Sequence, residues 1–151
     1  MRFVVLLCGP PGAGKTTAAR ASGLAVFDSD EPRWSSRAEF TAALTQLGAT
    51  PDAQAVVIRT APTSASRAAV AATVGATHVY VLTEPTKVLN SRVMRRGRRT
   101  ARNELAAIAR WNQQHERLDG APDFPGWDSI TADEPTPLAA VTPEGATVRD
   151  W

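Results

Sequence analysis

Residues 3–17 read FVVLLCGPPGAGKTT, an apolar run followed at once by a glycine-rich turn and the start of a helical pattern. The turn fits G-x-x-x-x-G-K-[ST] at every fixed position, from Gly9 to Thr16. A continuous apolar run that ends in such a turn is typical of a central strand in a parallel sheet. The stretch therefore predicts an α/β protein built around this strand.

The glycine-rich turn has the composition of a phosphate-binding loop. Glycines let consecutive backbone N–H groups curl around phosphate oxygens, and the N-terminus of the following helix adds a favourable dipole. In this pattern Lys15 reaches the β- and γ-phosphates, and the Thr16 hydroxyl binds Mg²⁺. The alternative is a glycine-rich turn that matches by chance. We expect ATP and Mg²⁺ to be bound here, by Gly9, Gly12, Ala13, Gly14, Lys15, Thr16 and Thr17.

Strand and helix patterns alternate along the first 117 residues. Apolar runs predict strands over 2–8, 24–27, 55–58 and 77–82. Helical periodicity predicts helices over 15–22, 36–47, 64–74, 86–95 and 101–117, with Gly48 ending the second. Such alternation indicates a parallel sheet covered on both faces. Ligands of these sheets bind beyond the carboxyl ends of the strands, so the loops 9–16, 28–33, 59–63 and 83–85 are expected at the site.

Length and composition indicate one soluble domain. The chain has 151 residues, of which 43% are hydrophobic and 21% charged. No apolar run approaches the roughly 20 residues of a membrane span, and the short N-terminal run does not resemble a signal peptide. The single cysteine, Cys8, excludes an internal disulfide and suits a reducing compartment. We therefore expect a cytoplasmic protein without membrane contact, in which Cys8 packs in the core.

The last part of the chain, residues 119–151, differs in composition. It holds seven acidic residues against Arg149 alone, and five of the eleven prolines. We expect an irregular, acidic tail packed on a core of residues 1–118 through Trp127 and Trp151. Apolar residues at 130, 138, 141 and 148 could still form a short edge strand.

Two carboxylates follow the second predicted strand. Asp28 and Asp30 are two residues apart, so an extended backbone points both to the same side. Beside a bound triphosphate, one could hold Mg²⁺ through water and the other could accept a proton from an attacking hydroxyl. The alternative is a turn or helix cap. The third strand ends at Arg59 with no acidic residue, which favours a kinase over an ATP-driven machine.

Basic residues gather between residues 87 and 102, where seven cations occur without an acidic residue. We expect part of this segment to be a lid, because arginines stabilise the charge on a phosphoryl group in transfer. The alternative is a solvated helical face. Arg33 and Arg59, at the ends of two strands, are expected to contact substrate, with a surface arginine as the alternative reading of Arg33.

Residues 1–117 resemble the small P-loop kinases that include polynucleotide 5′-kinases, gluconate kinase and related phage and bacterial kinases, within the AAA-type P-loop NTPase superfamily. The resemblance rests on residues 9–17, on Asp28-Ser-Asp-x-x-Arg33 and on Arg92-x-x-x-Arg96-Gly97. It implies a three-layer α/β/α fold with a five-stranded parallel sheet in the order 2-3-1-4-5. The lid at about residues 92–102 is shorter than in that group, and the tail has no counterpart there.

The resemblance also implies roles for single residues. Lys15 and Thr16 would act on ATP and Mg²⁺, and Asp30 would be the base toward a substrate hydroxyl. Arg33 would hold a substrate phosphate, while Arg92 and Arg96 would contact the nucleotide or the transferred phosphoryl group. Lys15, Asp30 and Arg96 are the expected catalytic residues, and Asp28, Arg33 and Arg59 the expected substrate-binding ones.

The function expected from these features is transfer of the γ-phosphoryl group of ATP to a hydroxyl of a nucleic-acid 5′-end or a modified nucleotide. Three alternatives stay open: a nucleoside monophosphate or small-metabolite kinase, a P-loop ATPase without an acceptor, and a nucleic-acid-binding module. The acceptor and the oligomeric state are also open.

Overall fold

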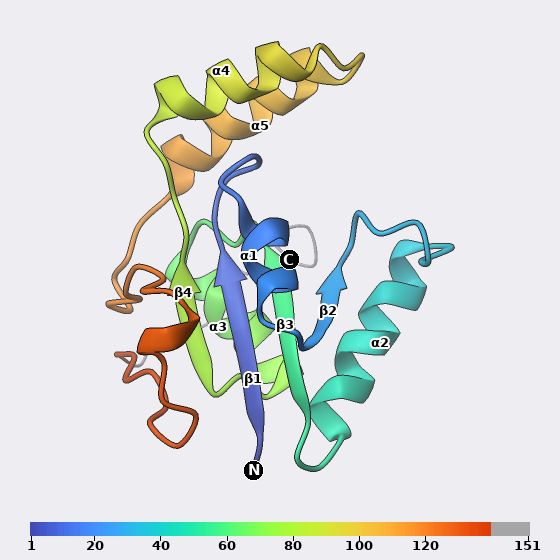
Figure 1. Ribbon diagram of the computed structural model, residues 1–151, viewed down its shortest axis with the longest axis vertical. Coiled ribbons are helices and arrows are strands. Elements are labelled where there is room, and N and C mark those ends of the chain that lie inside the picture. Colours follow the sequence, from blue (N-terminus) through green and yellow to red (C-terminus); the bar gives the residue numbers. More distant parts are fainter. Residues whose placement is uncertain (140–151) are drawn as a thin grey trace.

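Four parallel strands form the centre of the protein, in the order β2-β3-β1-β4 (Figure 1). The computed structural model describes residues 1–139. The strands are β1 (Phe3–Cys8), β2 (Ala25–Asp28), β3 (Gln54–Arg59) and β4 (His78–Val81). The expected α/β class, with its parallel sheet around the strand before the glycine-rich turn, is confirmed.

The helices lie close to their expected positions. They are α1 (Lys15–Ala21), α2 (Arg37–Ala49), α3 (Ser64–Val74), α4 (Thr86–Arg96) and α5 (Ala101–Gln114), followed by the short 3-10 helix η1 (Trp127–Ser129). The expected stop at Gly48 is wrong, because α2 runs through it. A Cβ at Gly48 would lie 2.1 Å from the Thr73 carbonyl oxygen, so this glycine permits the close approach of α2 and α3.

The expectation of five strands is wrong for the described residues. At the free edge of β4, the place of a fifth strand is taken by a single bridge between Val81 and Asp123. The Val81 N–H donates to Pro122 at 2.9 Å, and the Phe124 N–H donates to Val81 at 3.0 Å. Prolines at 122 and 125 flank the bridge. Because proline has no N–H to donate, the pairing does not extend into a strand.

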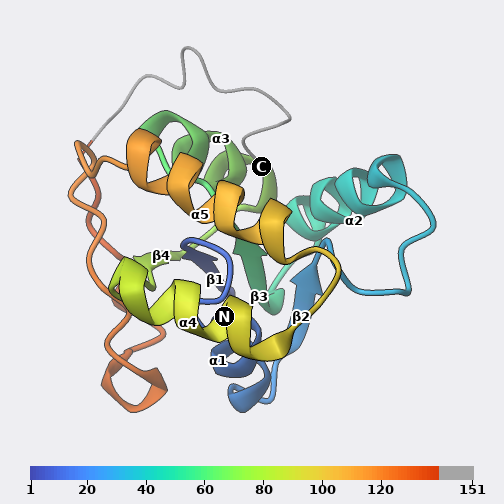
Figure 2. The ribbon, with the colours of Figure 1, turned by 90° about the horizontal axis from the view of Figure 1, so that it is seen from above.

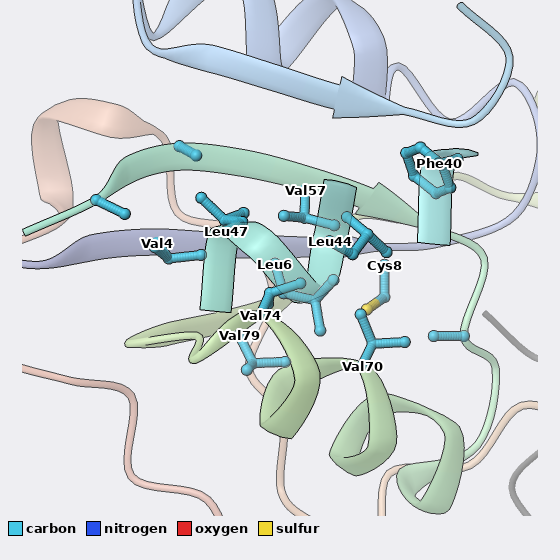
Figure 3. Packing of buried hydrophobic residues seen from close by; sticks show 13 residues of the cluster. Val4, Leu6, Cys8, Phe40, Leu44, Leu47, Val57, Val70, Val74 and Val79 are labelled. Carbon is cyan, nitrogen blue, oxygen red and sulfur yellow. The ribbon is translucent and has the colours of Figure 1, made fainter. Parts of the chain in front are cut away.

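The two faces of the sheet are covered differently. On one face, Val4, Leu6 and Cys8 pack with buried residues of α2 and α3 (Figure 3). On the other face, Val5 and Leu7 pack against α1 and against the segment that follows α5, through Phe124, Trp127 and Ile130. The Trp127 indole N–H donates to the Ala18 carbonyl oxygen at 2.7 Å. The C-terminal segment therefore supplies packing on a face that has only one short helix. Trp151 lies outside the described residues, as do positions 141 and 148.

The helices α4 and α5 lie together beyond the carboxyl ends of the strands, above the loop that joins β1 to α1 (Figures 1 and 2). Leu89 and Val93 of α4 and Ile108 of α5 are fully buried and pack with Ala13 of that loop. The segment expected to form a lid is thus a helical pair seated on the glycine-rich loop.

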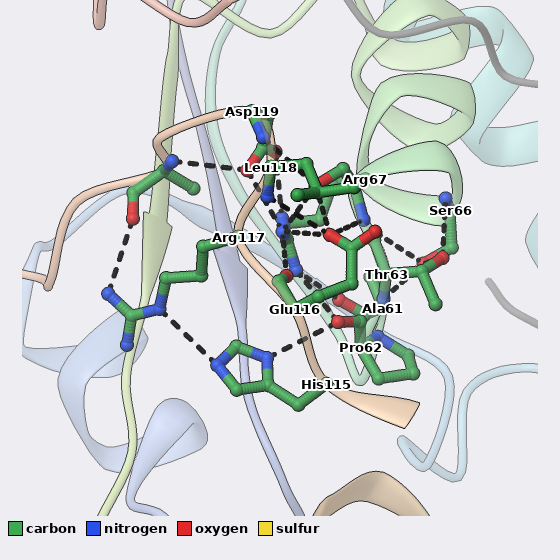
Figure 4. Close-up of polar contacts among 12 residues, drawn as sticks. Ala61, Pro62, Thr63, Ser66, Arg67, His115, Glu116, Arg117, Leu118 and Asp119 are labelled. Carbon is green, nitrogen blue, oxygen red and sulfur yellow. Dashed lines mark hydrogen bonds and ion pairs between the residues drawn. The ribbon is translucent and has the colours of Figure 1, made fainter. Parts of the chain in front are cut away.

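A buried arginine joins the loop after β3 to the end of α5 (Figure 4). Arg67 has no exposed surface, and its guanidinium donates to both carboxylate oxygens of Asp119 at 2.9 Å. It also donates to the carbonyl oxygens of Ala61 and Pro62 at 3.1 Å and of Glu116 at 2.5 Å. Every nitrogen of the guanidinium has a partner, so the burial of this charge is compensated.

We predict that Arg67→Met destabilises the protein by about 3–5 kcal/mol, because it leaves the Asp119 carboxylate buried without its cation. Urea unfolding followed by tryptophan fluorescence measures the loss. The exposed Arg110→Met in α5 is the matched control and is expected to change stability by less than about 0.5 kcal/mol. A loss for Arg67→Met no larger than that of the control would contradict the prediction.

We also predict that the Cys8 thiol is unreactive in the folded protein. Cys8 is fully buried, and burial raises the pKa of its thiol to about 12. A disulfide reagent such as dithionitrobenzoate is expected to label it only after unfolding in urea. Stoichiometric labelling of the native protein within minutes would show that the prediction is wrong.

Candidate functional site

The glycine-rich loop leaves β1 beside the ends of β3 and β4. The Gly9 N–H lies 3.3 Å from the carbonyl oxygens of Arg59 and Thr60. A Cβ at Gly9 would come within 2.0 Å of the Leu82 carbonyl oxygen, so no other residue fits there without moving β4. Gly12 and Gly14 have φ values of 81° and 96°, in the left-handed region that favours glycine. The loop therefore needs its glycines.

The N-terminus of α1 faces out of this loop. Gly14 is the N-cap of α1, and no side chain caps the helix. The first backbone N–H of α1 with a backbone partner in the described chain is that of Ala18, which donates to Gly14 at 2.9 Å. The N–H groups of the first turn, including those of Lys15 and Thr16, have no partners within the helix. Such groups are the donors that bind phosphate oxygens in loops of this sequence.

Lys15 is buried inside the loop. Its ammonium donates to the carbonyl oxygens of Gly9 at 2.5 Å and Pro10 at 2.9 Å. Burial lowers the pKa of Lys15 to about 8, against an upward contribution from Asp28 and Asp30. A cation held at this cost has a strong preference for an anionic ligand, because phosphate oxygens compensate its charge better than carbonyl dipoles do.

Thr16 and Asp28 meet at the mouth of the loop. The Thr16 hydroxyl donates to the Asp28 carboxylate at 3.0 Å, and that carboxylate is largely buried. The other carboxylate oxygen of Asp28 accepts the Asp30 N–H at 3.1 Å, and the Trp34 indole donates to the Asp28 carbonyl oxygen at 2.9 Å. We expected Asp28 to contact substrate. In the structure its carboxylate lies against the hydroxyl of Thr16, the residue expected to bind Mg²⁺. Hydroxyl and carboxylate oxygens are ligands that Mg²⁺ accepts, so this pair fits the ion.

Asp30 differs from Asp28 in exposure. Its backbone is held by Asp28, while its side chain is exposed at the mouth of the site. Burial lowers the pKa of both Lys15 and Arg59, and the charge of Asp30 acts on both in the opposite direction. The two carboxylates thus have different surroundings, one turned toward the loop and one toward solvent.

Two of the lid arginines reach the loop. Arg92 donates to the Gly12 carbonyl oxygen at 2.9 Å and pairs with Glu84 at 3.3 Å. Arg96 lies one turn further along α4, and a Cβ at Gly12 would be 3.7 Å from its guanidinium. Glu104 of α5 lies 3.8 Å from Arg96. The structure therefore brings together Arg92, Arg96 and the loop. Arg96 is exposed, as are the other arginines of the segment, namely Arg95, Arg98, Arg99 and Arg102, and no contact of those four with the loop occurs within residues 1–139.

Arg33 and Arg59 have different surroundings. Arg33 turns back onto β2, where it donates to the Val26 carbonyl oxygen at 2.6 Å and pairs with Glu31 at 3.3 Å. Its guanidinium lies 4.3 Å from the ring centroid of Trp34. Arg59 lies at the end of β3, with its guanidinium 5.2 Å from the ring centroid of Phe40. The partners of Arg33 in the described chain are therefore all groups of the protein that lie within seven residues of it.

Several residues that shape the site were not predicted from the sequence. Glu84 follows β4 in one of the four loops expected at the ligand edge, so its position was a usable signal. Arg67 shares a helix face with Val70 and Val74, and an arginine on an apolar stripe is a sign of a buried charge. For Glu104 the sequence offers no such sign.

Within residues 1–139, no helix combines the length and apolarity that a membrane span needs. In the same residues, no group of three or more His, Cys, Asp and Glu side chains could hold a metal by itself. No protein-family model and no curated protein sequence matches this chain.

We predict that Lys15→Met makes the protein more stable at about pH 7, by about 1–2 kcal/mol, because the gain from removing a desolvated charge exceeds the two lost hydrogen bonds. The folded-state pKa of Lys15 is lowered, so the cost of burying its charge is full below about pH 8 and is relieved as the pH rises. The stability difference should therefore shrink by about 1 kcal/mol between about pH 7 and about pH 9.

Urea unfolding of both proteins at the two pH values measures this difference, and the titration of Cys8 largely cancels in the comparison. Lys87→Met, at the only other lysine, is the matched control because Lys87 is exposed on α4. Its stability difference should be small at both pH values. A Lys15→Met protein that is less stable than wild type at neutral pH would refute the prediction.

Proposed function

We propose that this chain has the P-loop NTPase fold and is an ATP-dependent kinase that transfers the γ-phosphoryl group to a hydroxyl of an acceptor. The observation that carries the proposal is the contact between Thr16 and Asp28 at the mouth of the glycine-rich loop, with the exposed Asp30 beside it. The buried Lys15 and the two lid arginines at the loop add support.

Each group has a role in this proposal. The loop N–H groups and Lys15 bind the β- and γ-phosphates, and Thr16 and Asp28 hold Mg²⁺, Thr16 directly and Asp28 directly or through water. When bound, Mg²⁺ neutralises charge on the phosphate oxygens. Arg92 and Arg96 approach the same phosphates from α4. Asp30 accepts the proton of the acceptor hydroxyl as its oxygen bonds to the γ-phosphorus and the bond to the bridging oxygen breaks, releasing ADP.

Transfer is favoured over hydrolysis by the positions of the carboxylates. Both lie at the end of β2, and β3 ends in Arg59 without an acidic residue. A base beside an open mouth suits an acceptor hydroxyl. We propose a nucleic-acid 5′-end or a modified nucleotide as acceptor, because the lid itself carries several exposed arginines. A nucleoside monophosphate or small metabolite is the alternative acceptor, and a P-loop ATPase is the alternative class.

Radiolabelled ATP with a panel of acceptors tests the proposal. The panel contains 5′-hydroxyl oligonucleotides, hydroxymethylated DNA, nucleosides, nucleoside monophosphates and sugar acids. We expect label on at least one acceptor, dependent on Mg²⁺ and absent with Lys15→Met. Label that appears only as free phosphate would refute the kinase and support the ATPase.

We predict that Asp30→Asn lowers the rate of transfer by about 10²–10⁴-fold, because the amide cannot accept the proton. ATP affinity, measured by calorimetry, should change by less than about threefold, since Asp30 does not bind the phosphates. Asp128→Asn, at an exposed carboxylate of η1, is the matched control. Full transfer activity in Asp30→Asn would exclude Asp30 as the base.

A further inference from the structure

One arginine in the described chain stands apart from the others by its lack of partners. Five arginines of residues 1–139 are buried or half-buried: Arg2, Arg59, Arg67, Arg92 and Arg117. Four of them donate hydrogen bonds to carbonyl or carboxylate oxygens. For Arg59 no such bond or ion pair exists in that part of the chain, and its Nε atom is buried without a partner. A half-buried guanidinium without an acceptor is unfavourable unless a ligand supplies one.

The surroundings of Arg59 orient its side chain without satisfying it. Its guanidinium lies over the ring of Phe40, a buried residue of α2. The aromatic face attracts the cation but leaves the N–H groups in the plane of the guanidinium free to donate. Burial, followed by the charge of Arg37, lowers the pKa of Arg59 to about 10. The Arg59 side chain therefore remains charged at neutral pH, and its position is fixed by the contact with the Phe40 ring.

The position of Arg59 relates this cation to the proposed site. Arg59 pairs in register with Cys8, the last residue before the glycine-rich loop, and its carbonyl oxygen lies 3.3 Å from the Gly9 N–H. β3 lies between β1 and β2 in the sheet, so Arg59 stands on the side of the glycine-rich loop that faces β2 (Figure 1). Asp30, the proposed base, lies two residues after Asp28, which pairs in register with Ile58, the neighbour of Arg59. A ligand on Arg59 would thus sit on the side of the site where β2 ends and the base follows.

We propose that Arg59 binds an anionic group of the phosphoryl acceptor, which is therefore a hydroxyl compound that carries a phosphate or carboxylate. This inference rests on the proposed function in one respect, that the bound molecule is an acceptor. Arg33 and Arg59 were both expected to contact substrate, and the inference assigns the anion to Arg59, because Arg33 pairs with Glu31 and stacks on Trp34 whereas the Arg59 Nε has no partner within residues 1–139. A planar guanidinium binds phosphate and carboxylate alike, through paired N–H donors.

Steady-state kinetics with matched acceptors tests the assignment. The acceptors are a nucleoside monophosphate, a sugar acid and a neutral nucleoside, and the variants are Arg59→Met, Arg59→Lys and Arg33→Met. We expect Arg59→Met to raise KM for the anionic acceptor by about 10- to 100-fold, with KM for ATP unchanged. Arg59→Lys should recover part of the loss. A loss confined to the phosphate-bearing or the carboxylate-bearing acceptor identifies the anion. A loss with Arg33→Met and none with Arg59→Met would overturn the inference.

A binding measurement tests the anion site without turnover. In a Lys15→Met background, inorganic phosphate is titrated at constant ionic strength and the unfolding temperature is followed. Arg59→Met in that background should weaken the phosphate response by about tenfold or more, and Arg20→Met, at an exposed arginine of α1, should leave it unchanged. Because Arg59 makes no hydrogen bond or ion pair within residues 1–139 and Met can also pack on Phe40, Arg59→Met itself should change stability little.

The two experiments separate the two proposals. If wild type labels no acceptor, the proposed function fails, and the phosphate titration alone decides whether Arg59 binds anions. If wild type labels an anionic acceptor but Arg59→Met keeps its KM and its phosphate response, the kinase stands and the assignment of Arg59 is wrong.

Discussion

The Arg67 guanidinium donates to groups from three parts of the chain: the loop after β3, the end of α5 and Asp119. The loop it holds includes Ala61, a buried non-glycine residue with a φ of 30°. Strained backbone of this kind persists only where surrounding contacts fix it. Arg59 and Thr60 lie directly before this turn and beside Gly9. The backbone at the carboxyl ends of β3 and β1, beside the proposed site, therefore depends on the fully buried charge of Arg67.

Three kinds of cation occur around the proposed site, and their surroundings separate their roles. The Arg67 charge is fully compensated and structural. Lys15 and Arg92 have carbonyl partners in the loop that a phosphate could replace, because dipoles are weaker partners than anions. Arg59 has no partner at all in the described chain. Arginine content alone could not have drawn this distinction, since the chain is rich in arginine throughout.

Local patterns were sufficient for most of the architecture. The apolar run 3–8, the glycine-rich turn and the helical periodicities each depend on neighbours within one element, and the strands and helices lie where these patterns predict. What local pattern could not reveal are pairings between distant residues. Arg67 and Asp119 are 52 positions apart. The stacking of Arg59 on Phe40 likewise joins β3 to a residue of α2 that comes 19 positions earlier. The missing fifth strand follows from prolines whose meaning appears only beside β4.

The contact of Trp127 with the Ala18 carbonyl oxygen has a consequence for the order in which the chain is made. All residues of the proposed nucleotide site precede residue 97, whereas their supports at Asp119 and Trp127 are synthesised later. A ribosome releases the phosphate loop, its helix and its lid well before the segment that fixes them. The nascent chain thus carries the complete sequence motif for some time before it can hold the motif's final geometry. The final geometry of the glycine-rich loop and its supports should arise late in synthesis, when residues beyond 127 have left the exit tunnel.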